Sequence, residues 1–278
     1  AAALAGGDPN ATDTLRPEYR AQASAQRLLL ADANLLANQL GGERDALSSR
    51  SAEEREPTDE MRAVQLGNAL HYLHRAQERM GRARSQLRRR QGATAYHQAS
   101  GALFGLKRAR DQFREPVAMI DVLLAEQGAL AQRTREVLSA RQGIASQTSF
   151  SEGEPALAAE QNSLTGRTGE LDARLRSVSE GAAGPQAAAP GGAASAQAAQ
   201  IAALREARPF IERAHQRLLE AGEDLDARNL QGAQVGQYEG LQALKEARER
   251  FLDLRGLIEA AHADQVRIVE VLAQLENA

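Results

Sequence analysis

The sequence contains no cysteine and no tryptophan, and all of its aromatic residues together make up 3% of 278 residues. Without cysteine the chain can form no disulfide, no cysteine-ligated zinc site and no thiol nucleophile, and it fits a reducing or an oxidising compartment equally. No apolar run approaches the roughly 20 residues that span a bilayer, because Asp121 interrupts the best one, Val117 to Ala125. The sequence therefore predicts no membrane span.

Motifs of catalysis are missing as well. The chain has no glycine-rich phosphate loop, no HExxH and no nucleophile elbow. Its carboxylates mostly stand three or four residues from an arginine, as Glu246 does from Arg250, a spacing that supports a helix through surface ion pairs. We therefore expect a non-enzymatic protein without a cofactor.

The composition predicts an all-α protein. Alanine, leucine, glutamine, arginine and glutamate dominate, all of which favour helices, whereas β-branched residues are scarce. Hydrophobic residues make up 42% of the chain, enough for a core, and its length suits two units of ordinary size. The net charge of -3 makes no general argument for nucleic acid or anionic lipid.

The chain also repeats itself. Its only lysines, Lys107 and Lys245, stand 138 residues apart, and at this shift residues 63–140 align with residues 201–278 without a gap. Identical pairs include Leu66 and Leu204, Arg79 and Arg217, Leu106 and Leu244, Phe113 and Phe251, Ile120 and Ile258, and Gln127 and Gln265. Upstream, a shift of 135 aligns Gln26, Leu29, Leu36 and Leu40 with Gln161, Leu164, Leu171 and Leu175. Because the matches keep helical spacing, the pattern predicts a tandem duplication.

Each copy is predicted to be an elongated unit of three helices, an antiparallel hairpin plus an extra helix, packed in a coiled-coil-like manner. The predicted helices are 17–40, 58–90 and 93–141 in the first unit, residues 17–150, and 155–179, 195–228 and 231–276 in the second, residues 151–278. Residues 1–16 are expected to form a flexible tail, which fits either a processed terminus or the edge of a fragment, and residues 181–195 a flexible tether.

Glycine and proline mark the expected turns. Gly92 and Gly232 stand where each hairpin should turn, since glycine enters the left-handed conformation freely. Pro116 and Pro209 lie within helical stretches, and each should kink or break its helix. A long helical arm, broken at Gly143 to Pro155, is expected to link the units.

Basic residues crowd the tip of the first hairpin. From Arg75 to Arg114 there are eleven basic residues, opposed only by Glu78 and Asp111. The candidate interaction residues are Arg82, Arg84, Arg88, Arg89, Arg90, Lys107 and Arg108. This pattern is typical of a solvated helix face or of a docking patch for an anion. The anion could belong to an acidic protein, to a phosphate-bearing surface, or to the second hairpin of a neighbouring copy. That hairpin carries Glu220, Glu223, Asp224 and Asp226, and such contacts would run head-to-tail.

Two other kinds of site are disfavoured. His71, His74 and Glu78 share one helix face and could hold a divalent metal, but the aligned positions in the second copy are Pro209, Glu212 and Gln216. An exposed polar face is the better interpretation of these three residues. Nucleic acid is an unlikely partner by sequence, because Tyr96 is the only aromatic residue near the basic tip.

One resemblance adds a context. The stretch HRAQERMGRARSQLRRRQGATAYHQASGALFGLKRAR, residues 74–110, and the runs Glu126 to Thr134 and Glu160 to Thr168 carry it. They resemble the C-terminal helical repeats of a family of large, uncharacterised, membrane-anchored bacterial proteins, mainly proteobacterial. The resemblance implies the bacterial cell envelope or periplasm and a structural or assembly role, and it supplies no catalytic residue.

These observations predict an all-α scaffold or assembly protein that presents helical surfaces to protein partners, a second copy of the chain among them. Two alternatives stay open. One is a ligand-sensing bundle, which should carry a polar, aromatic-lined gap and is disfavoured by seams rich in alanine and glycine. The other is an anion or nucleic-acid binder that uses the arginine-rich tip.

Overall fold

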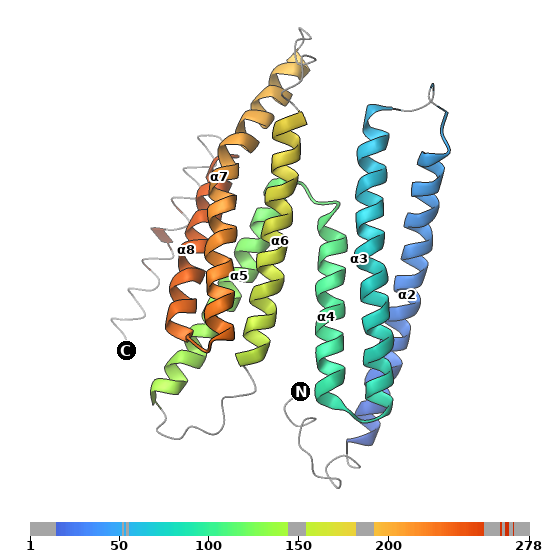
Figure 1. Ribbon diagram of the computed structural model, residues 1–278, viewed down its shortest axis with the longest axis vertical. Helices are drawn as coiled ribbons and strands as arrows, with labels where there is room; N and C mark the ends of the chain where they lie inside the picture. Colours follow the sequence, from blue (N-terminus) through green and yellow to red (C-terminus); the bar gives the residue numbers. More distant parts are fainter. Residues whose placement is uncertain are drawn as a thin grey trace. The chain divides into compact units, whose positions relative to one another are not determined.

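The computed structural model describes residues 15–51, 53, 56–143, 154–181 and 192–252, together with residues 262, 265, 266 and 269. Within this part of the chain the protein is all-helical, with helices α2 to α8 and no strand, as the composition predicts (Figure 1). The chain divides into two compact units, unit 1 from Ala1 to Arg114 and unit 2 from Glu115 to Ala278. The repeat predicted from the sequence was divided at residue 150, so α5, which falls in its predicted first copy, belongs to unit 2 of the structure.

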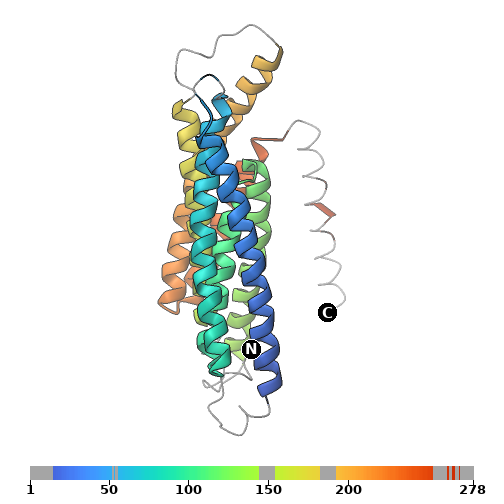
Figure 2. The same ribbon diagram turned by 90° about the vertical axis from the view of Figure 1, so that its right-hand side faces the viewer.

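Unit 1 is a layer of three helices, α2 (Arg16–Ser48), α3 (Pro57–Arg88) and α4 (Gly92–Asp111). Helix α3 is the main packing partner of both α2 and α4, and the three run side by side (Figures 1 and 2). The core between them consists of two separate clusters. One contains Leu73, Met80 and Ala33, and the other contains Tyr19 and Leu87.

Unit 2 is a closed bundle of four helices, α5 (Pro116–Gly143), α6 (Glu154–Gly181), α7 (Gly192–Asp226) and α8 (Leu230–Glu249). Helix α5 packs on α6 and α8, and α7 packs on the same two helices from the other side. A single continuous core fills the bundle, and four of its fully buried leucines come one from each helix: Leu130, Leu171, Leu218 and Leu244.

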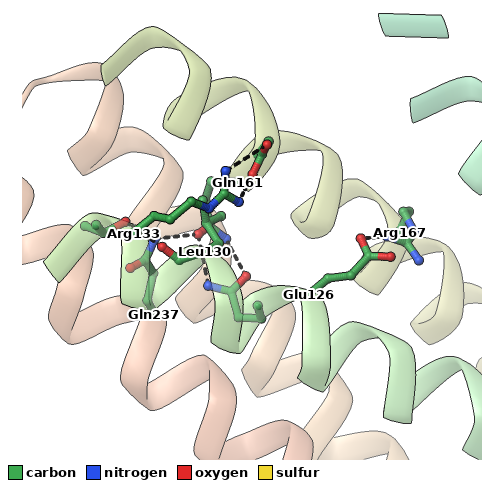
Figure 3. A network of polar contacts seen from close by, with 9 residues as sticks. Glu126, Leu130, Arg133, Gln161, Arg167 and Gln237 are labelled. Carbon is green, nitrogen blue, oxygen red and sulfur yellow. Dashed lines mark hydrogen bonds and ion pairs between the residues drawn. The ribbon is translucent and has the colours of Figure 1, made fainter. Parts of the chain in front are cut away.

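A buried amide cluster joins α5 to the rest of unit 2 (Figure 3). Gln127 and Gln161 exchange two hydrogen bonds of 3.1 and 3.2 Å between their side-chain amides. The Nε2 atom of Gln237 donates to Oε1 of Gln161 at 3.0 Å and to Oγ1 of Thr134 at 3.2 Å. All four side chains are 0% exposed. Because a buried amide without a partner is costly, this cluster specifies how α5 sits against α6 and α8.

Charged pairs line the edge of the same interface. Arg167 of α6, 0% exposed, donates to Glu126 of α5 at 2.7 Å, and Arg133 of α5 pairs with Glu160 of α6. These pairs run in opposite order along the two helices, so α5 and α6 are antiparallel. The helices on the two sides of the expected break therefore fold back on each other and do not extend as an arm. The break itself, at residues 144–153, lies outside the described residues.

The two hairpin turns are built differently from the expectation. The left-handed residues are Arg90 and Arg228, with φ of 60° and 61°, and none of the described glycines has a positive φ. Gly92 begins α4, and Gly232 is the third residue of α8. The turns were therefore placed correctly to within a few residues, but arginine occupies the left-handed position.

The same hydrogen bonds close both turns. The N–H of Gln91 donates to the carbonyl of Gln86 at 2.9 Å, and the N–H of Asn229 donates to the carbonyl of Asp224 at 2.7 Å. A hydrogen bond from an N–H to the carbonyl five residues earlier is characteristic of a Schellman motif, which satisfies the last carbonyls of a helix.

The expected helix 93–141 is two helices. Helix α4 ends at Asp111 and α5 begins at Pro116, as the proline predicts. Helix α8, expected to continue to residue 276, ends at Glu249, the position aligned with Asp111, although no proline follows there. Short i to i−3 bonds from Phe113 and Phe251, of 3.1 and 3.0 Å, tighten the chain at both breaks. Proline therefore accompanies the break without being its only cause, and α7 continues through Pro209.

Other boundaries also differ. Helix α2 runs to Ser48 instead of Leu40, and its extension is tied to α3 by an ion pair of 2.9 Å between Glu43 and Arg62. Helix α7 begins at Gly192, so the last residues of the expected tether are helical. Residues 1–14 and 182–191, which hold most of the expected tail and tether, lie outside the described residues.

Helices α7 and α8 approach closely at Gly236, and this contact yields a prediction. A Cβ atom at Gly236 would lie 3.0 Å from the carbonyl oxygen of Arg217 and 3.2 Å from the backbone nitrogen of Ala221, which cannot move aside as a side chain can. We expect Gly236→Ala to lower the free energy of unfolding by about 1 kcal/mol or more, despite the better helix propensity of alanine. The control is Gly67→Ala in α3, where nothing lies within 4 Å. It should stabilise by up to about 1 kcal/mol in urea unfolding. Equal effects would contradict the close approach.

The left-handed turn of unit 2 yields a second prediction. Arg228 holds a conformation that disfavours residues with a Cβ atom, so Arg228→Gly should raise the free energy of unfolding by about 0.5–1 kcal/mol. The control is Arg250→Gly, at the right-handed C-cap of α8, which should not stabilise. Thermal unfolding followed by circular dichroism measures both, and a destabilised Arg228→Gly variant would refute the expectation.

Candidate functional site

Helix α2 and the C-terminal end of α3 enclose a cavity of about 500 Å³ in unit 1. It is lined by Arg16, Tyr19, Arg20, Ala23, Ser24, Arg27, Arg84, Leu87, Arg88 and Arg90. Six of these residues are arginines and none is acidic, so we name this cavity the arginine pocket.

The arginines come from three pieces of backbone. Arg16, Arg20 and Arg27 lie at i, i+4 and i+11 on one face of α2. Arg84 and Arg88 lie one turn apart near the end of α3, and Arg90 follows in the left-handed turn. Helical periodicity on both helices therefore aims cationic side chains into the same space.

An apolar floor lies beneath the arginines. Tyr19, Ala23, Leu87 and Ala95 form a buried cluster, and Tyr19 is 3% exposed. The small side chain of Ala23 lets α2 approach the end of α3, which brings the two rows of arginines together. The pocket thus combines a charged rim with an apolar base.

Five of the six arginines have no acidic partner among the described residues. Arg16, Arg20, Arg27, Arg84 and Arg88 make no ion pair and no side-chain hydrogen bond with any described residue. Guanidinium groups stay protonated at all ordinary pH values and match carboxylate and phosphate oxygens with paired N–H donors. Like charges in a concave site strengthen the local positive potential. The arrangement is therefore suited to binding an anion.

The predicted interaction residues divide into two groups. Arg84, Arg88 and Arg90 line the pocket, whereas Arg82, Arg89, Lys107 and Arg108 do not. Arg82 lies 4.0 Å from Glu78, and the guanidinium of Arg108 lies 5.7 Å from the ring centre of Tyr72. Arg89 is the exposed C-cap of α3, and Lys107 is half-buried on α4.

Sequence reasoning missed the arginines of α2. The spacing of Arg16, Arg20 and Arg27 on one helix face was the available signal. It went unused because the basic tip was considered as part of one hairpin, and α2 precedes that hairpin in the chain.

Three of the four acidic residues near the turn of unit 2, all except Glu223, are engaged within their own unit. Glu220 pairs with Arg217 at 2.8 Å, and Asp224 accepts a hydrogen bond from Asn229 at 2.8 Å. Asp226 accepts from Asn162 at 3.5 Å. This turn therefore offers less free negative charge to a neighbouring copy than its sequence suggests.

Metal and membrane sites were also sought. His71, His74 and Glu78 are exposed, and the described residues contain no group of three or more histidine, aspartate or glutamate side chains arranged to hold a metal ion. Among the described helices, none is both long enough and apolar enough to cross a membrane.

Comparison with known proteins assigns no relative. No protein-family model matches the chain, and no significantly similar curated protein or solved structure was found. The function is therefore inferred from the protein's own residues.

Crowded arginines repel one another, and this gives a prediction. Arg20→Glu should raise the melting temperature at low ionic strength, with a gain of roughly 0.5 kcal/mol, because a carboxylate would relieve repulsion within the pocket. The gain should shrink at high salt. The control is Arg82→Glu, outside the pocket, which would face Glu78 and should be neutral or slightly destabilising. If Arg20→Glu destabilises the protein at low salt, the pocket arginines are not in mutual repulsion.

Proposed function

We propose that this protein is a non-enzymatic scaffold or assembly protein, and that the arginine pocket docks an anionic group of a protein partner. The observation that carries the proposal is a set of five arginines around a cavity of about 500 Å³ that make no ion pair with any residue the structure describes. Proteins usually balance crowded charges internally, so an unbalanced concave cluster is the expected form of a site that a partner neutralises.

The shape of the pocket favours an acidic segment of a protein. Paired N–H donors of arginine suit carboxylates, and the floor of Tyr19 and Leu87 suits an apolar side chain next to them. A partner that buries both kinds of group would gain specificity from the charges and affinity from the floor.

We further propose that the fold is a duplicated helical module whose copies have specialised. Support comes from the matching left-handed turns at Arg90 and Arg228 and from the matching helix ends at Asp111 and Glu249. The positions aligned with Arg84 and Arg88 are Gly222 and Asp226, so the cationic pocket belongs to the first copy alone.

A small-molecule sensor is the second candidate. A cavity of about 500 Å³ falls within the size of ordinary ligand sites, and Tyr19 supplies an aromatic wall. The ligand would then be a small polyanion. In either case, the resemblance of residues 74–110 to membrane-anchored bacterial proteins favours placement in the bacterial envelope.

The proposal predicts a selective loss of anion binding. In the double variant Arg84→Glu/Arg88→Glu, we expect affinity for an oligo-glutamate peptide that contains one leucine to fall at least about tenfold. The control, Arg82→Glu/Arg89→Glu, makes the same change of charge on α3 outside the pocket and should alter affinity no more than about threefold. Fluorescence anisotropy at physiological salt measures both.

Three probes separate the candidates. Binding of the peptide but not of pyrophosphate supports the docking role, and tight pyrophosphate binding alone supports the sensor. A single-stranded oligonucleotide that outcompetes both would favour the nucleic-acid alternative. Equal losses in the two double variants would show a diffuse cationic surface and overturn the pocket.

A further inference from the structure

Unit 1 carries an apolar face that no described helix of the unit covers. Leu29 and Leu36 of α2 are 50% and 44% exposed, and Leu103 of α4 is 50% exposed. Ala25 lies on the same side of α2. Ala99 and Leu106 lie on the same side of α4 and are half-buried, Leu106 in part against the core of unit 1. We name these six residues the open face. Other apolar side chains of unit 1 are exposed as well, among them Leu28, Leu35, Met61 and Val64. Apolar residues that recur on one face of two helices nevertheless mark a candidate interaction site.

The aligned face of unit 2 is buried under α5. Leu164 and Leu171 of α6, aligned with Leu29 and Leu36, are 4% and 0% exposed. They share a helix face with Arg167, which pairs with Glu126 of α5. Leu244 of α8, aligned with Leu106, is 0% exposed. Unit 2 therefore shows what covers this face, which is a fourth helix with the features of α5.

An unsatisfied amide marks the same place in unit 1. Gln26 is aligned with Gln161, whose amide is paired with Gln127 and Gln237. The Oε1 atom of Gln26 is buried and has no hydrogen-bond partner among the described residues. Buried acceptors of this kind are rare and costly in native proteins. The Oε1 atoms of Gln86 and Gln237 are also buried without a partner, so Gln26 adds the aligned amide to the comparison and does not by itself identify a missing helix.

The C-terminal segment of the chain, residues 254–278, has the sequence of the missing helix. It aligns with residues 116–140 of α5. The buried positions of α5 are Met119, Ile120, Leu123, Gln127, Leu130, Ala131 and Thr134, and the aligned residues are Leu257, Ile258, Ala261, Gln265, Ile268, Val269 and Leu272. All of the latter are apolar except Gln265, which repeats the amide of Gln127. The described part of this segment is helical, and there Gln265 and Val269 are exposed.

One hydrogen bond of unit 2 has apolar residues at both of its aligned positions. Thr134 of α5 accepts a hydrogen bond from Gln237 of α8. The aligned positions hold Leu272 and Ala99, so both partners are apolar. Joint replacement is expected if the segment and the open face meet, because a lone polar group would be left unsatisfied.

Charged positions behave in two ways. Asp121 of α5 pairs with Arg248 of α8, and the aligned Glu259 and Arg110 keep both charges. The aligned residues of the pair Glu126 and Arg167 are instead Asp264 and Asp32, two carboxylates. Asp32 is exposed, so this position weakens a contact without forbidding it.

The connectivity indicates that the segment packs outside the unit it follows. Helix α5 follows α4 in the chain, yet it packs on α6 and α8 of the next unit. Residues 254–278 follow α8 after the same kind of break, at Glu249. The same construction carries this segment to an α2–α4 layer outside its own unit, and a second copy of the chain offers one.

We infer that residues 254–278 of one copy dock on the open face of a second copy and complete a four-helix bundle there. Such contacts are head-to-tail, so copies assemble into rings or filaments. The inference rests on the assembly role proposed above, but it uses a surface different from the arginine pocket.

Two full-length variants test the contact by complementation. Leu29→Glu/Leu36→Glu disables the open face and keeps the segment, whereas Ile258→Glu/Ile268→Glu disables the segment and keeps the face. In analytical ultracentrifugation the wild-type mass should rise with concentration, and each variant alone should stay monomeric. An equimolar mixture should form a one-to-one dimer that grows no further. A chain with all four changes should not join the Ile258→Glu/Ile268→Glu variant.

A charge change tests the contact in the opposite direction. In Asp32→Arg, the new arginine should pair with Asp264 of the docked segment, as Arg167 pairs with Glu126 in unit 2. This ion pair should tighten association about fivefold. The control is Asp45→Arg, also on α2 but off the open face, which should change association less than about twofold. Because this variant gains affinity, misfolding cannot imitate the expected result.

The outcomes separate this contact from the arginine pocket. The inference is overturned if the wild type remains monomeric or if the mixture of variants forms no dimer. A segment that docks within its own chain would give the first of these results. If Arg84→Glu/Arg88→Glu abolishes self-association while Leu29→Glu/Leu36→Glu preserves it, the pocket and not the open face holds the second copy. If the two variants form their dimer but the acidic peptide does not bind, the function proposed for the arginine pocket is refuted and the docking of the segment is not.

Discussion

Each helix of an antiparallel bundle carries two apolar stripes and needs a neighbour for both. Helix α6 meets this requirement in unit 2, because α7 covers one stripe and α5 covers the other. The buried amide of Gln161 is tolerated only because α5 brings Gln127 to it and α8 brings Gln237. Closure by α5 is thus the condition on which the continuous core of unit 2 depends. Helix α2 has only α3 as its main neighbour in unit 1, and its second stripe stays exposed.

The helix breaks make this closure possible. A continuous helix through α4 and α5 could not serve two units, since its direction would be fixed by the first hairpin. Short i to i−3 bonds at Phe113 end α4, and Pro116 then starts α5 with a nitrogen that needs no hydrogen bond. The same bonds at Phe251 end α8 without a proline. The recurrence of this break is what connects the architecture of unit 2 to the proposed head-to-tail assembly.

Unit 1 differs from unit 2 mainly in what its surfaces expose. Ala23 and Tyr19 allow α2 to approach the end of α3, and the arginines of both helices then share one concave site. Substitution by Gly222 and Asp226 removes the aligned charges from unit 2, whose acidic side chains are paired locally. The proposed docking functions therefore fall on the unit whose bundle is open. The docking function of the arginine pocket rests on positive charge that unit 1 does not neutralise. That of the open face rests on apolar area that unit 1 does not cover.

The sequence alone determined the helical class and the positions of the hairpins to within a few residues, because propensity and periodicity act locally along the chain. Proline geometry marked Pro116 as a place for a kink or a break, but α7 continues through Pro209. The sequence also singled out Arg84, Arg88 and Arg90, which line the cavity of the proposed site. The tertiary structure alone decided that Arg16, Arg20 and Arg27 join them, that arginine and not glycine takes the left-handed turns, and that α5 belongs to unit 2. Each of these depends on which helices become neighbours in space. The packing of two segments that are distant in the chain cannot be read from the local sequence of either segment.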